Sequence, residues 1–293
     1  MKEKWKSKRL LSILLMLCMV LTMVPITGVT ASAADDTYGY GSIMDWGGFR
    51  SCLGSIISRD LTLENDIDYT MGYDDEEIRI DRSQKLDLNG HKIRIDATKR
   101  AGFFNLITIR RGEFTLCDSQ GGGEIEVEFA MDYKRHSIIE ISPINKDDPV
   151  KFTMNGGTLT RLNPMESNVY GNNGCISDDY FNKFEDGERP QITINGGTIK
   201  CAYDWDRSKY DKSTSSSMLN SVEYMPTALL LRYSNLTVNG GTFNGIVWTE
   251  KLTPRKEDTE PRVSLNGGVF NYPFVVSGLP KNVTQVVIDG ASF

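Results

Sequence analysis

One short frame occurs six times in this chain and limits its fold more than any other feature. In Ile192-Thr193-Ile194-Asn195-Gly196-Gly197-Thr198-Ile199, two alternating apolar residues precede an Asn-Gly pair, and a third apolar residue follows four positions after the Asn. Counted from the Asn or Asp, every copy has apolar residues at −3, −1 and +4. The six zero positions are Asn89, Asn155, Asn195, Asn239, Asn266 and Asp289, and a degenerate copy has Cys117 at zero.

Each copy of this Asn-Gly frame predicts two strands joined by a bend. Alternating apolar residues place two side chains on one face of a strand. An Asn-Gly pair permits the left-handed backbone conformation that turns the chain sharply. The local alternative is a two-residue β-hairpin, for which Asn-Gly is a strong signal. Further apolar pairs, such as Ile78 and Ile80, precede the copies and favour three short strands in each unit.

The distance between copies varies, as expected for coils that carry loops of different length. Successive zero positions lie 66, 40, 44, 27 and 23 residues apart, with the degenerate copy inside the longest interval. The frame resembles that of the pectin-lyase-like superfamily, in particular secreted proteins of the Gram-positive bacterial surface. The resemblance rests on the segment from Leu86 to Ile93 and on the Asn-Gly-Gly-Thr motifs at Asn155, Asn195 and Asn239. It implies an all-β, right-handed parallel β-helix of about seven coils over residues 61–293.

The first 33 residues have the features of a secretory signal peptide. A basic start is followed by an apolar stretch from Leu10 to Val24 that is short for a membrane span, and Ala31-Ser32-Ala33 is a typical cleavage site. The mature chain is therefore predicted to be secreted, extracellular or at the cell surface. The alternative is a retained N-terminal anchor.

The charge of the mature chain argues against two classes of partner. The whole chain has 33 basic and 39 acidic residues, and the leader holds five basic residues and one acidic residue. The remainder has 28 basic and 38 acidic residues, a net charge of −10. We therefore expect no nucleic-acid partner and no membrane association of the mature form.

Residues 34–60 are predicted to cap the first coil. Trp46, Phe49 and Leu53 lie on one face of a short helix, and Asp45 is suited to be its N-cap. A β-helix exposes core and strand edges at its ends, so a lid is expected there. A sugar-stacking role for Trp46 is the alternative.

The cysteines and acidic residues predict neither a metal site nor a cofactor. Four cysteines remain after the leader, without C-x-x-C spacing, and we expect buried thiols, with a Cys175–Cys201 disulfide as the alternative. The acidic run 74–77 lacks the spacing of known calcium motifs, so a solvated loop is preferred over a calcium site. The four cysteines are Cys52, Cys117, Cys175 and Cys201.

Two insertions, 163–189 and 202–226, and a shorter loop over 249–261 are predicted outside the repeats. Insertions of a solenoid commonly carry its function. The second insertion combines aromatic rings, which stack on sugars, with charged groups that bond sugar hydroxyls. The predicted ligand-binding residues are Tyr203, Asp204, Trp205, Asp206, Arg207 and Tyr210. The alternative is that these aromatic residues only pack the insertion onto the coil wall.

The preferred function is a non-catalytic module that binds a carbohydrate or another surface ligand. The resemblance also implies an alternative, a polysaccharide lyase or glycoside hydrolase, although none of that family's catalytic sequence motifs is found. No catalytic residue is predicted; the enzyme alternative would draw on Asp178, Asp179, Asp204, Asp206 and Arg207. A structural spacer is a third hypothesis.

The last copy predicts an uncovered C-terminal coil. Phe293 occupies its +4 position, and no capping segment follows it in this sequence. Because unpaired strand edges invite pairing, we expect self-association through this coil. The alternative is that the insertions fold over it.

Overall fold

The computed structural model describes the repeat region of the chain with internal gaps. The chain divides into two units, Met1–Thr37 and Tyr38–Phe293, and every described residue belongs to the second. The predicted signal peptide therefore lies outside the described residues. Within the described part, no helix has the length and apolar character needed to cross a membrane. The described ranges are 41–100, 102–130, 136–145, 147–148, 150–162, 174–178, 188–202, 227–249, 262–276 and 286–293.

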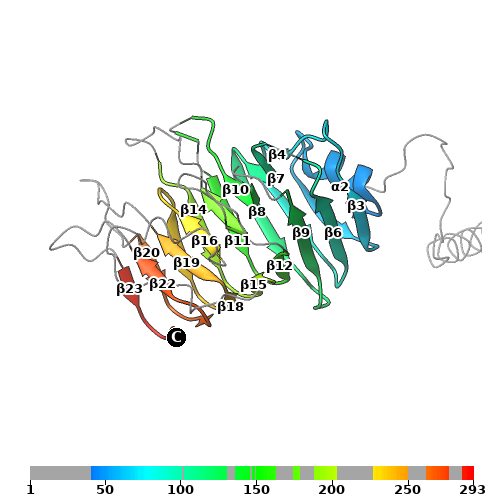
Figure 1. The fold of residues 1–293 in the computed structure, drawn as a ribbon. Helices are drawn as coiled ribbons and strands as arrows, with labels where there is room; N and C mark the ends of the chain where they lie inside the picture. Colours follow the sequence, from blue (N-terminus) through cyan, green and yellow to red (C-terminus); the bar gives the residue numbers. More distant parts are fainter. Residues whose placement is uncertain are drawn as a thin grey trace, which may run out of the picture. The chain divides into compact units, whose positions relative to one another are not determined.

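The second unit is a right-handed parallel β-helix, as predicted (Figure 1). Three sheets run along it, and each complete coil adds one strand to each sheet. Sheet A contains β1 (Ser42–Ile43), β2 (Arg59–Leu63), β5 (Gln84–Asp87), β8 (Gly112–Cys117), β11 (Val150–Met154), β14 (Gln191–Ile194), β17 (Asn235–Val238), β20 (Val263–Leu265) and β23 (Val286–Ile288).

Sheets B and C have seven strands each in the described part, which agrees with about seven coils. Sheet B contains β3 (Ile67–Thr70), β6 (Lys92–Ala97), β9 (Glu124–Phe129), β12 (Thr158–Arg161), β15 (Thr198–Cys201), β18 (Thr242–Asn244) and β21 (Val269–Phe270). Sheet C contains β4 (Ile78–Ile80), β7 (Phe104–Ile109), β10 (His136–Ile141), β13 (Ile176–Asp178), β16 (Thr227–Leu231), β19 (Ile246–Thr249) and β22 (Phe274–Val276).

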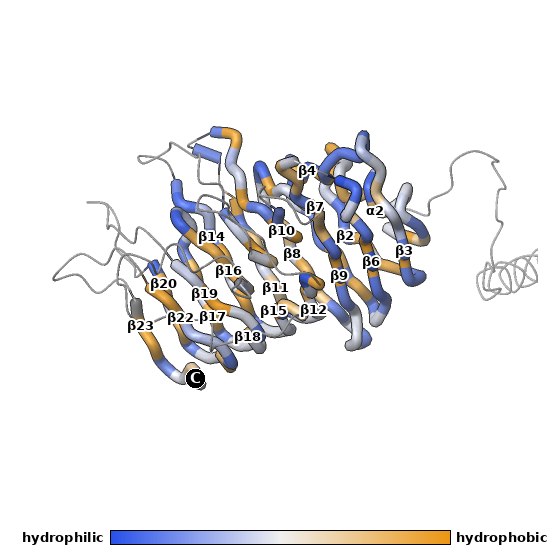
Figure 2. Tube along the Cα trace, in the orientation of Figure 1, coloured by the Kyte–Doolittle hydropathy of each residue, from blue (hydrophilic) through white to orange (hydrophobic). Residues whose placement is uncertain are grey.

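The register of the sheets stacks equivalent residues of successive coils on one another. In sheet A, Phe152 pairs with Ile192 and Ile192 pairs with Leu236, while Thr153 and Thr193 form a neighbouring column. Since side chains alternate between the faces of a strand, the first column points into the coil and the second points outward. Figure 2 shows the resulting alternation of hydrophobic and hydrophilic residues along the strands.

The apolar positions of the frame form the core, as predicted, in five of its six copies. Their −3, −1 and +4 residues are all buried, from the copy at Asn89 to the copy at Asn266. The last copy differs, because Ile288 is 56% exposed and Phe293 is 66% exposed. Phe293 nevertheless stacks on Phe270, with 5.1 Å between ring centroids. The exposed terminal coil agrees with the prediction, while self-association stays a prediction.

The Asn side chains of four bends form a hydrogen-bonded ladder from coil to coil. The Asn195 Nδ2 donates to Asn155 Oδ1 at 2.8 Å, and Asn239 Nδ2 donates to Asn195 Oδ1 at 2.8 Å. The next rung runs from Asn266 Nδ2 to Asn239 Oδ1 at 2.9 Å. Asn195 and Asn239 thus each donate to the preceding coil and accept from the following one, which requires the coils to be in register.

The residue with the left-handed backbone conformation is not the same in every bend. Only at Asn89 does the Asn itself adopt a positive φ, of 51°. In the Asn-Gly-Gly copies the second glycine does so, for example Gly197 with a φ of 89°. A Cβ at Gly197 would lie 2.5 Å from the Gly157 oxygen, so glycine is needed there both for its φ and for the close approach of the coils.

In the degenerate copy, Cys117 stands at the zero position in place of Asn, and the carboxylate of the next residue, Asp118, makes hydrogen bonds at the bend. Asp118 accepts hydrogen bonds from the backbone nitrogens of Gly90, at 2.7 Å, and Gly123, at 2.8 Å. It thereby joins the bend of the preceding coil to its own longer bend. Cys117, at the zero position, is half-buried, and its thiol points to the Leu86 oxygen at 3.5 Å.

A short helix covers the N-terminal end of the core, as predicted. Helix α2 (Trp46–Leu53) buries Phe49 and Leu53, and the Asp45 carboxylate caps it by accepting from the Gly48 nitrogen at 2.8 Å. Trp46 is half-buried and stacks on Tyr69 with 4.5 Å between ring centroids. Trp46 therefore packs as part of the capping helix, which is the interpretation preferred from the sequence.

The structure changes two of the predicted boundaries. The predicted cap, 34–60, also supplies β1 and the start of β2, which pair in parallel and extend sheet A. The predicted insertion 163–189 contains β13, which pairs with β10 and β16 and so belongs to a coil. The sequence pattern did not reveal this strand, because only one of its three residues, Ile-Ser-Asp, is apolar and no Asn-Gly bend marks it.

Replacing a core residue of the frame should cost far more stability than replacing its outward neighbour. Ile194→Ala is expected to lower the free energy of unfolding by about 2–5 kcal/mol, since it leaves a cavity in a packed core. Thr193→Ala, on the outward face of the same strand, is the matched control and should cost less than about 1 kcal/mol. Urea unfolding followed by circular dichroism measures both, and a larger loss at Thr193 would contradict the assigned faces.

Candidate functional site

The predicted ligand-binding residues lie outside the described part of the chain. This holds for Tyr203, Asp204, Trp205, Asp206, Arg207 and Tyr210, and also for Asp179. Of the residues named for the enzyme alternative, only Asp178 is described.

Asp178 is buried and acts as an anchor for a backbone turn. Its carboxylate, 1% exposed, accepts hydrogen bonds from the backbone nitrogens of Arg232, Tyr233 and Ser234 at 2.7–2.9 Å. Burial raises the pKa of Asp178, and these backbone hydrogen bonds act in the opposite direction. With its oxygens engaged in the protein interior, this carboxylate is unsuited to act as an acid or base on a glycan.

The same turn is held from its other side by an arginine of the following coil. Arg262 is 1% exposed, and its Nη2 donates to the backbone oxygens of Arg232 and Ser234 at 3.2 Å each. The turn is therefore clamped through its N–H groups by Asp178 and through its carbonyls by Arg262. Clamping of this kind stabilises the coil stack.

A groove lies on the outward face of sheet B. It has a volume of about 260 Å³ and crosses three neighbouring strands, β3, β6 and β9, and the end of β12. Tyr69 and Ile95 also line it, although they occupy the core-facing positions of their strands. The outward-facing lining residues are Asp68, Thr70, Arg94, Asp96, Glu126, Glu128 and Leu162.

The strand register explains why charged side chains meet in this groove. Asp68 pairs with Arg94 and Arg94 pairs with Glu126, so these three form one column across the strands. Asp96 and Glu128 pair in the next outward column. Since both columns point away from the core, every charged group among the lining residues can reach solvent or a ligand.

The groove combines four carboxylates with one guanidinium. Arg94 Nη1 lies 3.4 Å from Asp68 Oδ1, and Arg94 Nε lies 3.9 Å from Glu126 Oε1. The Arg94 side chain is 44% exposed, so these pairs contribute little to stability and remain available to a ligand. Hydrogen bonds from the Thr98 hydroxyl and backbone N–H lower the pKa of Asp96, which keeps this groove carboxylate charged at neutral pH.

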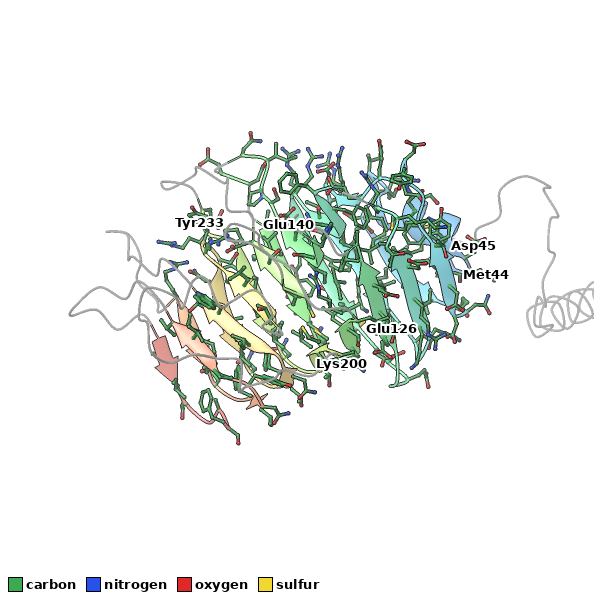
Figure 3. All side chains as sticks on the ribbon, viewed as in Figure 1. Met44, Asp45, Glu126, Glu140, Lys200 and Tyr233 are labelled. Carbon is green, nitrogen blue, oxygen red and sulfur yellow. The ribbon has the colours of Figure 1, made fainter. Side chains whose placement is uncertain are left out.

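A second, tighter ion network lies beside the groove on the same sheet. Glu124 on β9 is 3.1 Å from Lys92 Nζ on β6 and 3.0 Å from Lys200 Nζ on β15, and it accepts a hydrogen bond from the Thr160 hydroxyl. Burial alone would raise the pKa of Glu124, but these partners lower it to about 2. Glu126 and Lys200 are labelled on this sheet in Figure 3.

The sequence contained a signal for these residues that the repeat frame does not use. The runs Lys-Ile-Arg-Ile-Asp at 92–96 and Glu-Ile-Glu-Val-Glu at 124–128 alternate charged and apolar residues. Such alternation predicts a strand with charges on one face. What it could not predict is the register that aligns the two runs, because that depends on loops of different length. In the described ranges, no group of three or more His, Cys, Asp or Glu side chains is arranged to hold a metal ion.

Comparison of the chain with protein-family models, with curated proteins and with solved structures found no match.

The network around Glu124 should make the stability of the fold depend on pH. Because folding lowers the pKa of this carboxyl from 4.5 to about 2, the unfolded chain binds the proton more tightly. The stabilisation is complete above pH 4.5 and is lost as the pH falls toward 2; it amounts to at most about 3 kcal/mol. Glu124→Gln should therefore be less stable at pH 7, and its stability should fall less between pH 5 and pH 3 than that of the wild type.

Urea unfolding at a series of pH values measures this difference. Glu126→Gln on the same strand is the matched control, since its carboxylate lies 3.9 Å from Arg94, and it should keep the pH dependence of the wild type. Equal pH dependence in wild type and Glu124→Gln would show that the network does not stabilise the fold.

Proposed function

We propose that this chain is a secreted or cell-surface β-helix module that binds a carbohydrate on the outward face of sheet B. The observation that carries the proposal is the groove of about 260 Å³ that crosses β3, β6 and β9. It presents charged hydrogen-bonding side chains on an otherwise regular surface. These exposed side chains support the proposal of a polar binding surface.

The chemistry of the groove suits a ligand rich in hydroxyl groups. Carboxylates such as Glu126 and Glu128 only accept hydrogen bonds, whereas the Arg94 guanidinium only donates them. A sugar hydroxyl both donates and accepts, so it can bond to both kinds at once. Leu162, half-buried at the edge of the groove, offers an apolar contact for a sugar ring.

The scaffold favours binding because it holds these side chains in fixed positions. The charged side chains of the groove project from β6 and β9, which are paired on both sides, and from β3, which is paired on one side. A ligand therefore loses little free energy to ordering of the protein backbone. The same scaffold offers parallel columns along which an extended chain of sugars can lie.

Three expectations from the sequence belong to this proposal. Residues 1–33 would export the protein, and the Asn-Gly frame resembles that of the pectin-lyase-like superfamily. Tyr203, Trp205 and Tyr210 remain the sequence-based candidates for aromatic contacts with the ligand, beside Tyr69, which lines the groove. A net charge of −10 after removal of the leader supports a neutral or basic ligand over an acidic polymer.

A glycan array with the mature protein tests the proposal. The wild type should retain a subset of neutral or amine-bearing glycans, and Glu126→Gln/Glu128→Gln should bind them at least about tenfold more weakly, since two charged acceptors are lost. Asp60→Asn, on the outward face of sheet A, is the matched control and should bind as the wild type does. Trp205→Ala tests the predicted aromatic contact separately.

Two results would contradict the groove as the binding site. One is an array on which the wild type retains no glycan. The other is a folded Glu126→Gln/Glu128→Gln variant with unchanged affinity. Release of reducing ends or unsaturated products from a retained glycan would instead identify the protein as a hydrolase or lyase.

A further inference from the structure

Two of the four described cysteines lie side by side at one corner of the coil. Cys201 ends β15 in sheet B, and Cys175 directly precedes β13 in sheet C. Both are buried, and the two thiols are close enough to interact with each other. The four described cysteines are free thiols; Cys52, Cys175 and Cys201 are buried, as expected, whereas Cys117 is half-buried.

Backbone contacts hold both thiols at this corner. Cys201 Sγ lies 3.3 Å from the Thr227 oxygen, and the same oxygen accepts the Cys175 backbone N–H at 3.3 Å. Cys175 Sγ lies 3.3 Å from the oxygen of Lys200, the residue before Cys201. Both cysteines therefore contact the Thr227 oxygen, and Cys175 also contacts the residue that precedes Cys201.

The other two described cysteines are placed apart from this pair. Cys52 lies on α2 at the N-terminal end of the core, and Cys117 ends β8, whose partners in sheet A are β5 and β11. Cys175 and Cys201 are thus the described cysteines in mutual contact, which favours a Cys175–Cys201 pairing over one with Cys52 or Cys117.

We propose that Cys175 and Cys201 become joined by a disulfide bond when the chain folds in the presence of a small-molecule disulfide. Each cysteine gives up one electron and one proton, an S–S bond forms between the two Sγ atoms, and the oxidant is reduced to two thiols. The bond closes a loop from residue 175 to residue 201. It fastens the chain directly before segment 203–226, which holds the predicted aromatic site, and it does not depend on glycan binding.

The corner is suited to form the bond during folding and to protect it afterwards. Contact with Cys201, together with burial, raises the pKa of Cys175, so the folded protein holds this group as a thiol, which is a poor nucleophile. The thiolate that attacks the oxidant is available before the coil closes. Once formed, a bond enclosed at this corner is shielded from exchange with external thiols.

The experiment refolds the full chain with a mixture of oxidised and reduced glutathione and maps its peptides without reduction. We expect a cross-linked peptide pair that contains Cys175 and Cys201, lighter by two hydrogens than the separate peptides. Adding a reductant to the oxidised protein should lower its Tm by roughly 5–10 °C, because the cross-link restricts the unfolded chain.

Matched variants separate this bond from other effects of the thiols. Cys117→Ser should keep the cross-link and the effect of the reductant on Tm, while Cys175→Ala/Cys201→Ala should lose both. The double alanine variant also tests whether the reduced fold tolerates replacement of the pair. Refolded wild-type protein with both thiols unmodified, or with either one joined to Cys52 or Cys117, would overturn the proposal.

Discussion

The hydrogen bonds between successive coils are the interaction on which the rest of this structure depends. In a parallel β-helix each strand finds its partners one coil before and one coil after it, so the backbone is satisfied only when equivalent residues are in register. The Asn ladder strengthens this condition, because the amides of Asn155, Asn195, Asn239 and Asn266 bond only to the same position of a neighbouring coil. Register in turn places the apolar positions of five of the six copies of the frame in one continuous core.

The same register decides where chemistry can occur. Alternation along a strand leaves every second side chain free of the core, and stacking turns these side chains into columns across a sheet. On sheet B the columns are charged near β6 and β9, where they line a groove and form the network around Glu124. On the turn after β16, by contrast, Asp178 and Arg262 use their charges to clamp backbone groups in the interior. The charged residues of these two regions thus either line the outward surface of sheet B or bind backbone groups in the interior, according to the face on which they lie.

The sequence predicted the repeating part of the fold because one local frame recurs. Alternation around Asn195 identifies strand, bend and core face, and the pattern of Trp46, Phe49 and Leu53 identifies the lid. It did not predict β13, whose three residues carry no frame, or the second glycine as the left-handed residue of the bend, which depends on the close approach of the coils. The groove was missed because Arg94 and Glu126 lie 32 positions apart, and only the register of β6 with β9 joins them. The predicted aromatic site, Tyr203 to Tyr210, lies outside the described residues and remains a sequence-based prediction.

Distances along the outward column of sheet A test the stacked parallel coil most directly. Lys85, Thr153, Thr193, Thr237 and Ser264 occupy this column on β5, β11, β14, β17 and β20. Genetically encoded nitroxide side chains at Lys85 and one of the other positions would report the distances by pulsed electron spin resonance. The stack predicts a distance that grows by about 4.8 Å with each further coil, to about 24 Å between Lys85 and Ser264. Distances that do not increase in this order, as in a sheet of antiparallel hairpins at the Asn-Gly pairs, would contradict it.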